Sequence, residues 1–177
     1  MLDVLASAPG ARDPDLALLA PGRTPLSHAA LHAQVDAVGD ALAALGLGRG
    51  RRVGVALPDG PEAAVAVLAA MSWATCAPLN PRLDPNDCDA TLAQLRLDAL
   101  IVAEGDASPL VAAAAALAVP VVRLVARARA AAGVFDRLAG TALRGPPRAQ
   151  GRRAVAFNVS PRRCKNLCRL SVADLPR

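Results

Sequence analysis

Residues 51–73 read RRVGVALPDGPEAAVAVLAAMSW, and this stretch decides the fold class. The apolar run 53–57 ends at a cluster of turn residues, which is typical of a short buried strand. Pro61 suits the first position of a helix, and residues 62–73 are rich in Ala, Val and Leu with almost no charge. We therefore expect a buried strand followed by a helix that is buried on most sides.

The residues before this stretch predict a second helix. Apolar side chains recur at steps of three and four between residues 27 and 45, which is the spacing of one helix face. Ser27 is placed as an N-cap, and Gly46 as the residue that ends the helix. The apolar positions are Leu31, Val35, Val38, Leu42 and Leu45.

The residues after this stretch continue the alternation of strands and helices. We expect strands at 76–79, 100–102 and 119–125, the last interrupted by Pro120, and helices at 83–97 and 109–118. Strands that alternate with helices imply right-handed crossovers and parallel pairing. The sequence therefore predicts an α/β fold with a largely parallel sheet and flanking helices.

Charge divides the chain of 177 residues into a body and a tail. Residues 142–177 carry nine basic side chains and one acid, Asp174, whereas residues 1–141 carry eleven basic and fourteen acidic ones. The tail shows no sustained period of two or 3.6 residues, so we expect it to be poorly ordered. We divide the chain into an N-terminal extension at 1–16, a domain at 17–141 and a basic aperiodic tail at 142–177.

Composition argues against a membrane protein and against a metal site. No run reaches the length of about 18 apolar residues that a spanning helix needs, and the first residues are acidic rather than basic. We expect a cytoplasmic protein. The four cysteines at 76, 88, 164 and 168 include one C-x3-C pair without a nearby His, which favours reduced thiols over zinc ligands.

Several residues could suggest a binding or catalytic site but are explained more simply by the structure that their neighbours predict. The glycines at 46, 48 and 50 follow a helix and precede a strand, so they predict a helix cap rather than a phosphate loop. The loop 57–61 follows a strand, but its two prolines lack N–H donors for an anion. His28 and His32 lie one turn apart without a third ligand, and Trp73 lies in the apolar helix, where we expect it in the core.

Four segments, taken in order, resemble the beginning of the AMP-dependent synthetase/ligase family, the adenylate-forming acyl-CoA synthetases. They are LSHAAL at 26–31, GRGRRV at 48–53, ALPDGPE at 56–62 and CAPLNP at 76–81. Family members have a segment like LTYxEL, a Gly-Asp-Arg-Val-like turn, LPNxPE and APLNP in the same order. The resemblance runs from about residue 17 to 125, and the last segment is similar to the oxalate-CoA ligase-like branch.

The chain departs from the family in three residues and in one larger respect. Arg51 stands where the family usually has Asp, Asp59 where it often has Asn, and His28 where it often has Tyr. The family also has a glycine-rich phosphate loop after about residue 150, whereas this chain has no glycine from 152 onward. Such a loop needs glycines so that backbone N–H groups can converge on phosphates.

The resemblance implies that the full-length family uses ATP, Mg²⁺ and CoA with a small carboxylic acid to form an acyl-adenylate and then a thioester. This chain lacks the groups that both steps need. We therefore assign no catalytic, cofactor-binding or metal-binding residue from the family to this sequence. We expect a fragment, a truncated or a frameshifted synthetase without cofactor or ligase activity of its own.

Two other classes of function stay open from the sequence. One is a non-catalytic α/β interaction module, with self-association through apolar surface that the rest of a synthetase would cover. The other is a nucleic-acid binder that uses the basic tail. The absence of Tyr and the presence of only two Phe argue against the second, because base stacking needs aromatic side chains.

Overall fold

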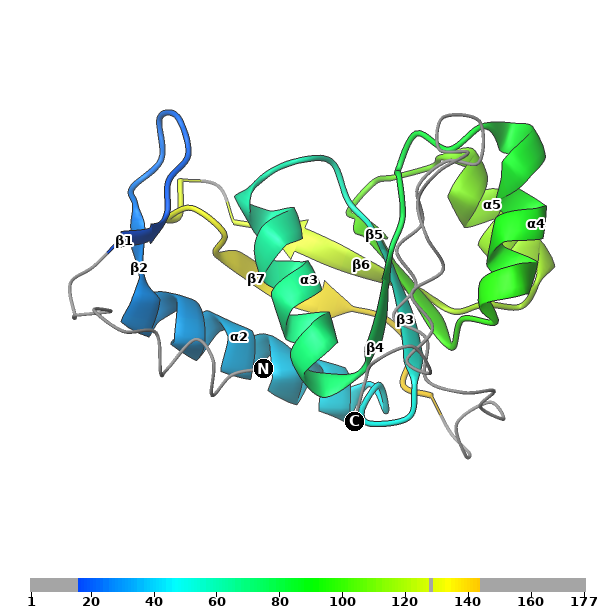
Figure 1. Cartoon of the computed structure of the whole chain (residues 1–177), viewed down its shortest axis with the longest axis horizontal. Coiled ribbons are helices and arrows are strands. Elements are labelled where there is room, and N and C mark those ends of the chain that lie inside the picture. The colour runs from blue at the N-terminus through cyan, green and yellow to red at the C-terminus, as the bar shows by residue number, and fades with distance from the viewer. Residues whose placement is uncertain (1–15, 128, 144–177) are drawn as a thin grey trace, which may run out of the picture.

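The computed structural model describes residues 16–127 and 129–143. Of the predicted extension at 1–16 only Leu16 is described, and of the predicted tail at 142–177 only residues 142 and 143 are; the rest of both segments lies outside the described residues. The elements, in chain order, are β1 Leu16–Leu18, β2 Leu26–Ser27, α2 His28–Ala44, β3 Arg52–Ala56, α3 Pro61–Trp73, β4 Thr75–Pro78, α4 Pro85–Leu95, β5 Ala99–Ala103, α5 Pro109–Ala116, β6 Val121–Ala126 and β7 Phe135–Ala139 (Figure 1).

The central sheet has the strand order β4-β3-β5-β6-β7. The pairs β3–β4, β3–β5 and β5–β6 are parallel, and β7 joins β6 antiparallel. Gly54 lies in the middle of the sheet, opposite Ala77 on one side and Leu100 on the other. The predicted α/β fold with a largely parallel sheet and flanking helices is confirmed.

The helices form one layer on each face of the sheet. The chain leaves β3 toward β4 in one direction, and then passes from β4 to β5 and β6 in the opposite direction. Because parallel crossovers are right-handed, this reversal places α3 on one face and α4 and α5 on the other. Helix α2 packs beside α3, and α4 packs beside α5 (Figure 1).

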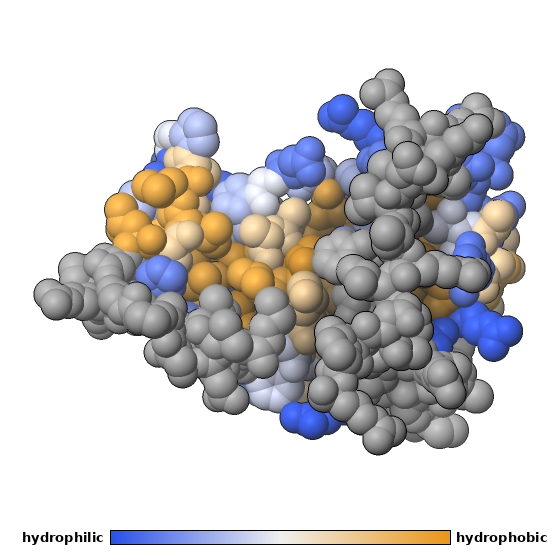
Figure 2. Space-filling model, in the orientation of Figure 1, coloured by the Kyte–Doolittle hydropathy of each residue, from blue (hydrophilic) through white to orange (hydrophobic). Residues whose placement is uncertain are grey.

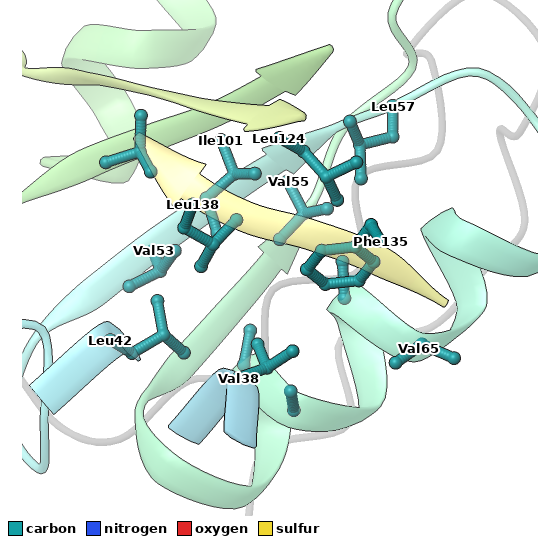
Figure 3. Packing of buried hydrophobic residues seen from close by; sticks show 14 of the residues in the cluster. Val38, Leu42, Val53, Val55, Leu57, Val65, Ile101, Leu124, Phe135 and Leu138 are labelled. Carbon is teal, nitrogen blue, oxygen red and sulfur yellow. The ribbon is translucent and has the colours of Figure 1, made fainter. Parts of the chain in front are cut away.

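Two buried clusters fill the space between the layers. The cluster under α2 and α3 draws Val38 and Leu42 from α2 and Phe135 and Leu138 from β7, together with side chains of β3 (Figure 3). The cluster under α4 and α5 includes Leu92, Leu100 and Leu110 among its members. The two faces of the sheet are therefore both buried, as the continuous apolar strands predict.

Local capping explains where the helices begin and end. The side chain of Ser27 accepts a hydrogen bond from the Ala30 N–H at 3.2 Å, and Gly46 follows α2 with φ of +73°. The N-cap and the stop predicted for this helix are both confirmed. Asp84 caps α4 in the same way by accepting from the Asn86 N–H, and Pro61, Pro85 and Pro109 begin the three later helices.

Several sequence expectations need correction. Strand β7 and the β1–β2 hairpin were not expected, because both are short and neither has a clear period. Helix α4 begins at Pro85 rather than at 83, α5 ends at Ala116, and β6 begins only after Pro120. Helix α3 has no exposed residue, as expected for a helix buried on most sides: Val65, Ala66, Ala69 and Ala70 are buried, and its other residues are half-buried.

Candidate functional site

A polar cleft of about 720 Å³ opens at the carboxyl ends of β3, β4 and β5. The loop after β3 leads to α3 on one face of the sheet, and the loops after β4 and β5 lead to helices on the other face. Ligands of open α/β sheets bind in a crevice of this kind, outside the ends of strands whose connections diverge. The cleft is lined by Pro58, Asp59, Asn80, Pro81, Arg82, Ala103, Glu104, Gly105 and Asp106.

Some polar residues of the cleft form hydrogen bonds that fix the loops around it. Asp106 accepts hydrogen bonds from the N–H and the hydroxyl of Ser108 at 2.8 and 3.3 Å, and its carbonyl accepts from Arg123 at 2.9 Å. Asn80 accepts from the Arg82 N–H at 2.9 Å. These bonds fix the loops after β4 and β5 and explain why polar residues follow both strands.

The charge of the cleft does not suit a phosphate. Three residues with carboxylates, Asp59, Glu104 and Asp106, line the cleft, against one with a guanidinium, Arg82. Phosphates are bound where N–H groups and positive charges converge, and the prolines at 58 and 61 remove two such N–H groups. Among the described residues, no group of His, Cys, Asp and Glu is arranged to hold a metal ion either.

The glycines at 46, 48 and 50 act as predicted. The N–H groups of Gly46 and Leu47 donate to the carbonyls of Ala43 and Leu42, at 2.9 and 2.7 Å. Gly46 and Gly50 have positive φ, which glycine adopts without strain. These residues therefore end α2 and turn the chain into β3. They lie at the amino end of β3, whereas the cleft lies at its carboxyl end.

The two imidazoles and the indole of Trp73 lie on α2 and α3, and none of them lines the cleft. His28 and His32 are half-buried on α2, and Trp73 is half-buried at the end of α3. A Cβ atom placed on Gly39 would overlap the indole of Trp73, so this glycine lets the two helices approach each other. The structure thus places Trp73 half-buried in a contact between α2 and α3, and not among the buried core residues where the sequence predicts it.

The two described thiols are reduced and buried. Burial raises the pKa of Cys76 to about 12, and burial followed by the charges of Asp89, Asp84 and Asp87 raises the pKa of Cys88. A thiol that stays protonated is a poor nucleophile and a poor metal ligand. Neither residue is suited to covalent chemistry. Cys164 and Cys168 lie outside the described part of the chain.

A buried ion pair accounts for the departure at Arg51. Asp98 is only 3% exposed, and its carboxylate accepts from the Arg51 guanidinium at 3.1 Å and from the Arg52 N–H at 2.8 Å. Sequence reasoning missed this contact, because the two residues are 47 positions apart. One sequence feature could have indicated the contact: Arg51 directly precedes β3 and Asp98 directly precedes β5. These two strands are neighbours in the sheet.

The largely parallel sheet with helices on both faces defines this chain as an α/β protein, and the comparisons identify the family. The profile of the AMP-binding enzyme family matches residues 7–151. This match covers most of the sequence. The chain belongs to the AMP-binding enzyme family.

Solved structures give the same result. Apo MatB from Rhodopseudomonas palustris is 25% identical, with a TM-score of 0.59, over 70% of this chain and 25% of that one. ATP-bound MatB from the same organism is 25% identical with a TM-score of 0.56, over 62% and 22%. The anthranilate CoA ligase AuaEII with anthranoyl-AMP is 25% identical with a TM-score of 0.56, over 65% and 22%.

The chain spans only about a quarter of the length of these solved proteins. No curated protein sequence matches it significantly. In addition, no helix among residues 16–127 and 129–143 is long and apolar enough to cross a membrane.

Proposed function

We propose that this chain corresponds to the opening α/β portion of an AMP-forming acyl-CoA synthetase, an ATP-dependent acid–thiol ligase, and has no ligase activity by itself. The observation that carries the proposal is the family match over residues 7–151, joined to structural neighbours that hold ATP or an acyl-adenylate. Those neighbours extend about four times further than the matched part.

The absence of activity follows from chemistry that this sequence lacks. The described cleft carries more carboxylates than guanidinium groups, and no glycine follows residue 151 to build a phosphate loop. Stabilising the charge that develops at the α-phosphate during adenylate formation requires donors or cations at that point. ATP, Mg²⁺, CoA and a small carboxylic acid are therefore ligands of the complete enzyme in this proposal.

The branch of the family, the domain bounds and the location in the cell are proposed from the sequence. We place the chain near the oxalate-CoA ligase-like branch because of the segment CAPLNP at 76–81. The domain bounds of 17–141 expected from the sequence lie inside the family match at 7–151, and we propose that the domain continues beyond 141. The cytoplasm, where acids are activated with ATP, is the proposed location.

Calorimetric titration of the 177-residue chain with ATP and Mg²⁺ tests the proposal, together with a pyrophosphate-exchange assay with small carboxylic acids. We expect neither heat of binding nor exchange, whereas the anthranilate CoA ligase AuaEII, run in parallel with anthranilate, should show both. Exchange by this chain would overturn the proposal, because it would require phosphate-binding groups that the described cleft does not contain.

A further inference from the structure

The β1–β2 hairpin lies at one end of the molecule, beside the loop that joins β6 to β7 (Figure 1). Leu16 and Leu19 of this hairpin are 56% and 71% exposed, and Leu18 is half-buried against the core. Figure 2 shows apolar residues on the surface at this end of the molecule. Burial of apolar side chains therefore contributes little to holding β1 and the turn after it in place.

The side chain of Arg23 connects the hairpin to two segments that are distant in sequence. Its Nε donates to the Ala130 carbonyl at 2.7 Å, and its Nη2 donates to the Ala131 carbonyl at 3.1 Å and to the Glu62 carboxylate at 2.9 Å. Hydrogen bonds from a charged donor are stronger than those from a neutral one. One guanidinium therefore joins the hairpin, the loop 130–134 and the first turn of α3.

The loop 130–134 fills the space between the hairpin and α3. The N–H of Ala132, a fully buried residue, donates to the Thr24 carbonyl at 2.9 Å. Gly133 has a φ of +83°, and a Cβ atom at this position would lie 2.6 Å from Cγ2 of Val65 and 3.1 Å from Cδ1 of Leu18. The hairpin and the helix thus enclose the loop so closely that a side chain has no space there.

The first turn of α3 continues directly from a wall of the polar cleft. Asp59, in the loop after β3, lines the cleft. The Ala64 N–H donates to the Gly60 carbonyl at 3.1 Å, which ties this loop to the helix. Glu62, which pairs with Arg23, lies between these two residues in the same turn. A change in the position of this turn would therefore move the wall of the cleft.

We propose that the hairpin at 16–27 and the loop 130–134 form a strap that opens and closes as one unit over the first turn of α3, with Arg23 holding it closed. Segments with few buried apolar contacts open at a lower free energy than the whole protein unfolds. Opening breaks the bonds of Arg23 and the Ala132–Thr24 bond, and leaves the central sheet intact. The order of the loop after β3 then depends on the strap. The proposal does not rest on the proposed function.

Hydrogen exchange of the 177-residue chain, measured by mass spectrometry, tests the proposal. In Arg23→Ala, amide groups in 16–27, 130–134 and 60–64 should exchange about 10- to 100-fold faster, because the hydrogen bonds of a charged donor are lost. Exchange in β5 should not change. Arg127→Ala is the matched control, since it removes an exposed ion pair with Asp136 near the same loop and should leave all three segments unchanged.

Two further variants examine how the strap is held. Arg23→Lys keeps the charge but lacks the planar fork that contacts both carbonyls and the carboxylate, so it should give a smaller increase than Arg23→Ala. Gly133→Ala keeps Arg23 but pushes the loop away from Val65, and it should accelerate exchange in the same three segments. Circular dichroism checks that each variant is folded, and Gly133→Ala suffices if Arg23→Ala does not fold.

Four outcomes would contradict the proposal. Faster exchange in the hairpin without a change in 130–134 would overturn opening as one unit. Unchanged exchange in 60–64 would overturn the dependence of the cleft wall on the strap. An equal acceleration in β5 would show that Arg23 supports the whole fold rather than a strap. The same acceleration in Arg127→Ala would show that Arg23 has no particular role in holding the strap closed.

Discussion

The buried pair of Arg51 and Asp98 shows at the scale of single residues how a tertiary contact explains an unusual residue. Arg51 stands at a position where an acid is usual in the family it resembles, and an arginine with 8% exposure would be costly without a partner. The partner comes from the residue that precedes β5. Because Asp98 also accepts from the Arg52 N–H, it fixes both the side chain and the backbone where β3 begins.

The variant Asp98→Ala should lower the free energy of unfolding by about 3–5 kcal/mol, since it leaves a buried guanidinium without its carboxylate. Asp136→Ala is the matched control, because it removes an exposed pair with Arg127 and should cost at most about 1 kcal/mol. Urea unfolding followed by circular dichroism measures both. Equal losses of unfolding free energy in the two variants would show that the buried pair stabilises the protein no more than the exposed pair does.

Cys76 should make the stability of the chain depend on pH in the alkaline range. The ordinary pKa of the thiol is 9.0 and burial raises it to about 12, so above pH 9 the unfolded chain loses a proton that the folded chain retains. The free energy of unfolding should then fall by about 1.4 kcal/mol per pH unit between pH 9 and 12. Below pH 9 this contribution is fully present.

The variant Cys76→Ala isolates this effect. It removes the thiol and should show a shallower loss of stability between pH 9 and 11 than the unaltered chain, with no difference in slope between pH 7 and 8. Urea midpoints at each pH provide the measurement. Parallel curves for the two proteins would mean that the Cys76 thiol ionises in the folded state as readily as in the unfolded state.

At the scale of elements, helix ends set the connections of the sheet. Helix α5 ends at Ala116, and two residues later Ala118 has a φ of +50°. The N–H groups of Ala118 and Val119 return to the carbonyls of Ala115 and Ala114. This arrangement satisfies the last carbonyls of the helix and turns the chain into β6. It places a residue with a Cβ atom in a conformation that favours glycine.

Replacing Ala118 by Gly should therefore stabilise the protein, by about 0.5–1 kcal/mol, because relief of the left-handed conformation exceeds the entropy that glycine loses on folding. The same substitution at the exposed position 112, Ala112→Gly, lies inside α5 and should destabilise by about 1 kcal/mol. Thermal unfolding compares the two. Destabilisation by both would show that the left-handed conformation at Ala118 stores no strain.

At the scale of the whole molecule, β7 closes the core. Phe135 and Leu138 are 5% and 8% exposed and lie in the cluster beneath α2 (Figure 3). The chain then returns to α2, where the Leu143 N–H donates to the Leu45 carbonyl at 2.9 Å. Leu143 was assigned to the tail from sequence, so this bond extends the packed body by at least two residues beyond 141.

A chain shortened to residues 1–143 should unfold in one cooperative transition, whereas a chain shortened to 1–134 should not. The shorter form loses Phe135 and Leu138, each worth roughly 1.5–3 kcal/mol of apolar burial, and leaves β6 without its outer partner. Urea unfolding monitored by circular dichroism and by Trp73 fluorescence compares them. A cooperative transition in the 1–134 form would show that β7 is not needed to complete the core.

The sequence by itself determined the order and type of most elements. The apolar runs near residues 53–57 and 100–102, the helical spacing at 27–45, and the capping residues Ser27 and Gly46 act within a few residues of chain. Local interactions of this kind leave a pattern that can be recognised without the fold. The loops after β3 and β4 were visible for the same reason, because each directly follows an apolar run.

Only the tertiary structure decided which of these loops meet, which charges pair and which faces remain open. The cleft combines residues from three loops, the Arg51–Asp98 pair spans 47 positions, and β7 forms because β6 offers it a partner. Each of these features depends on contacts between distant segments, and such contacts are set by the packing of the sheet rather than by any local pattern of residues.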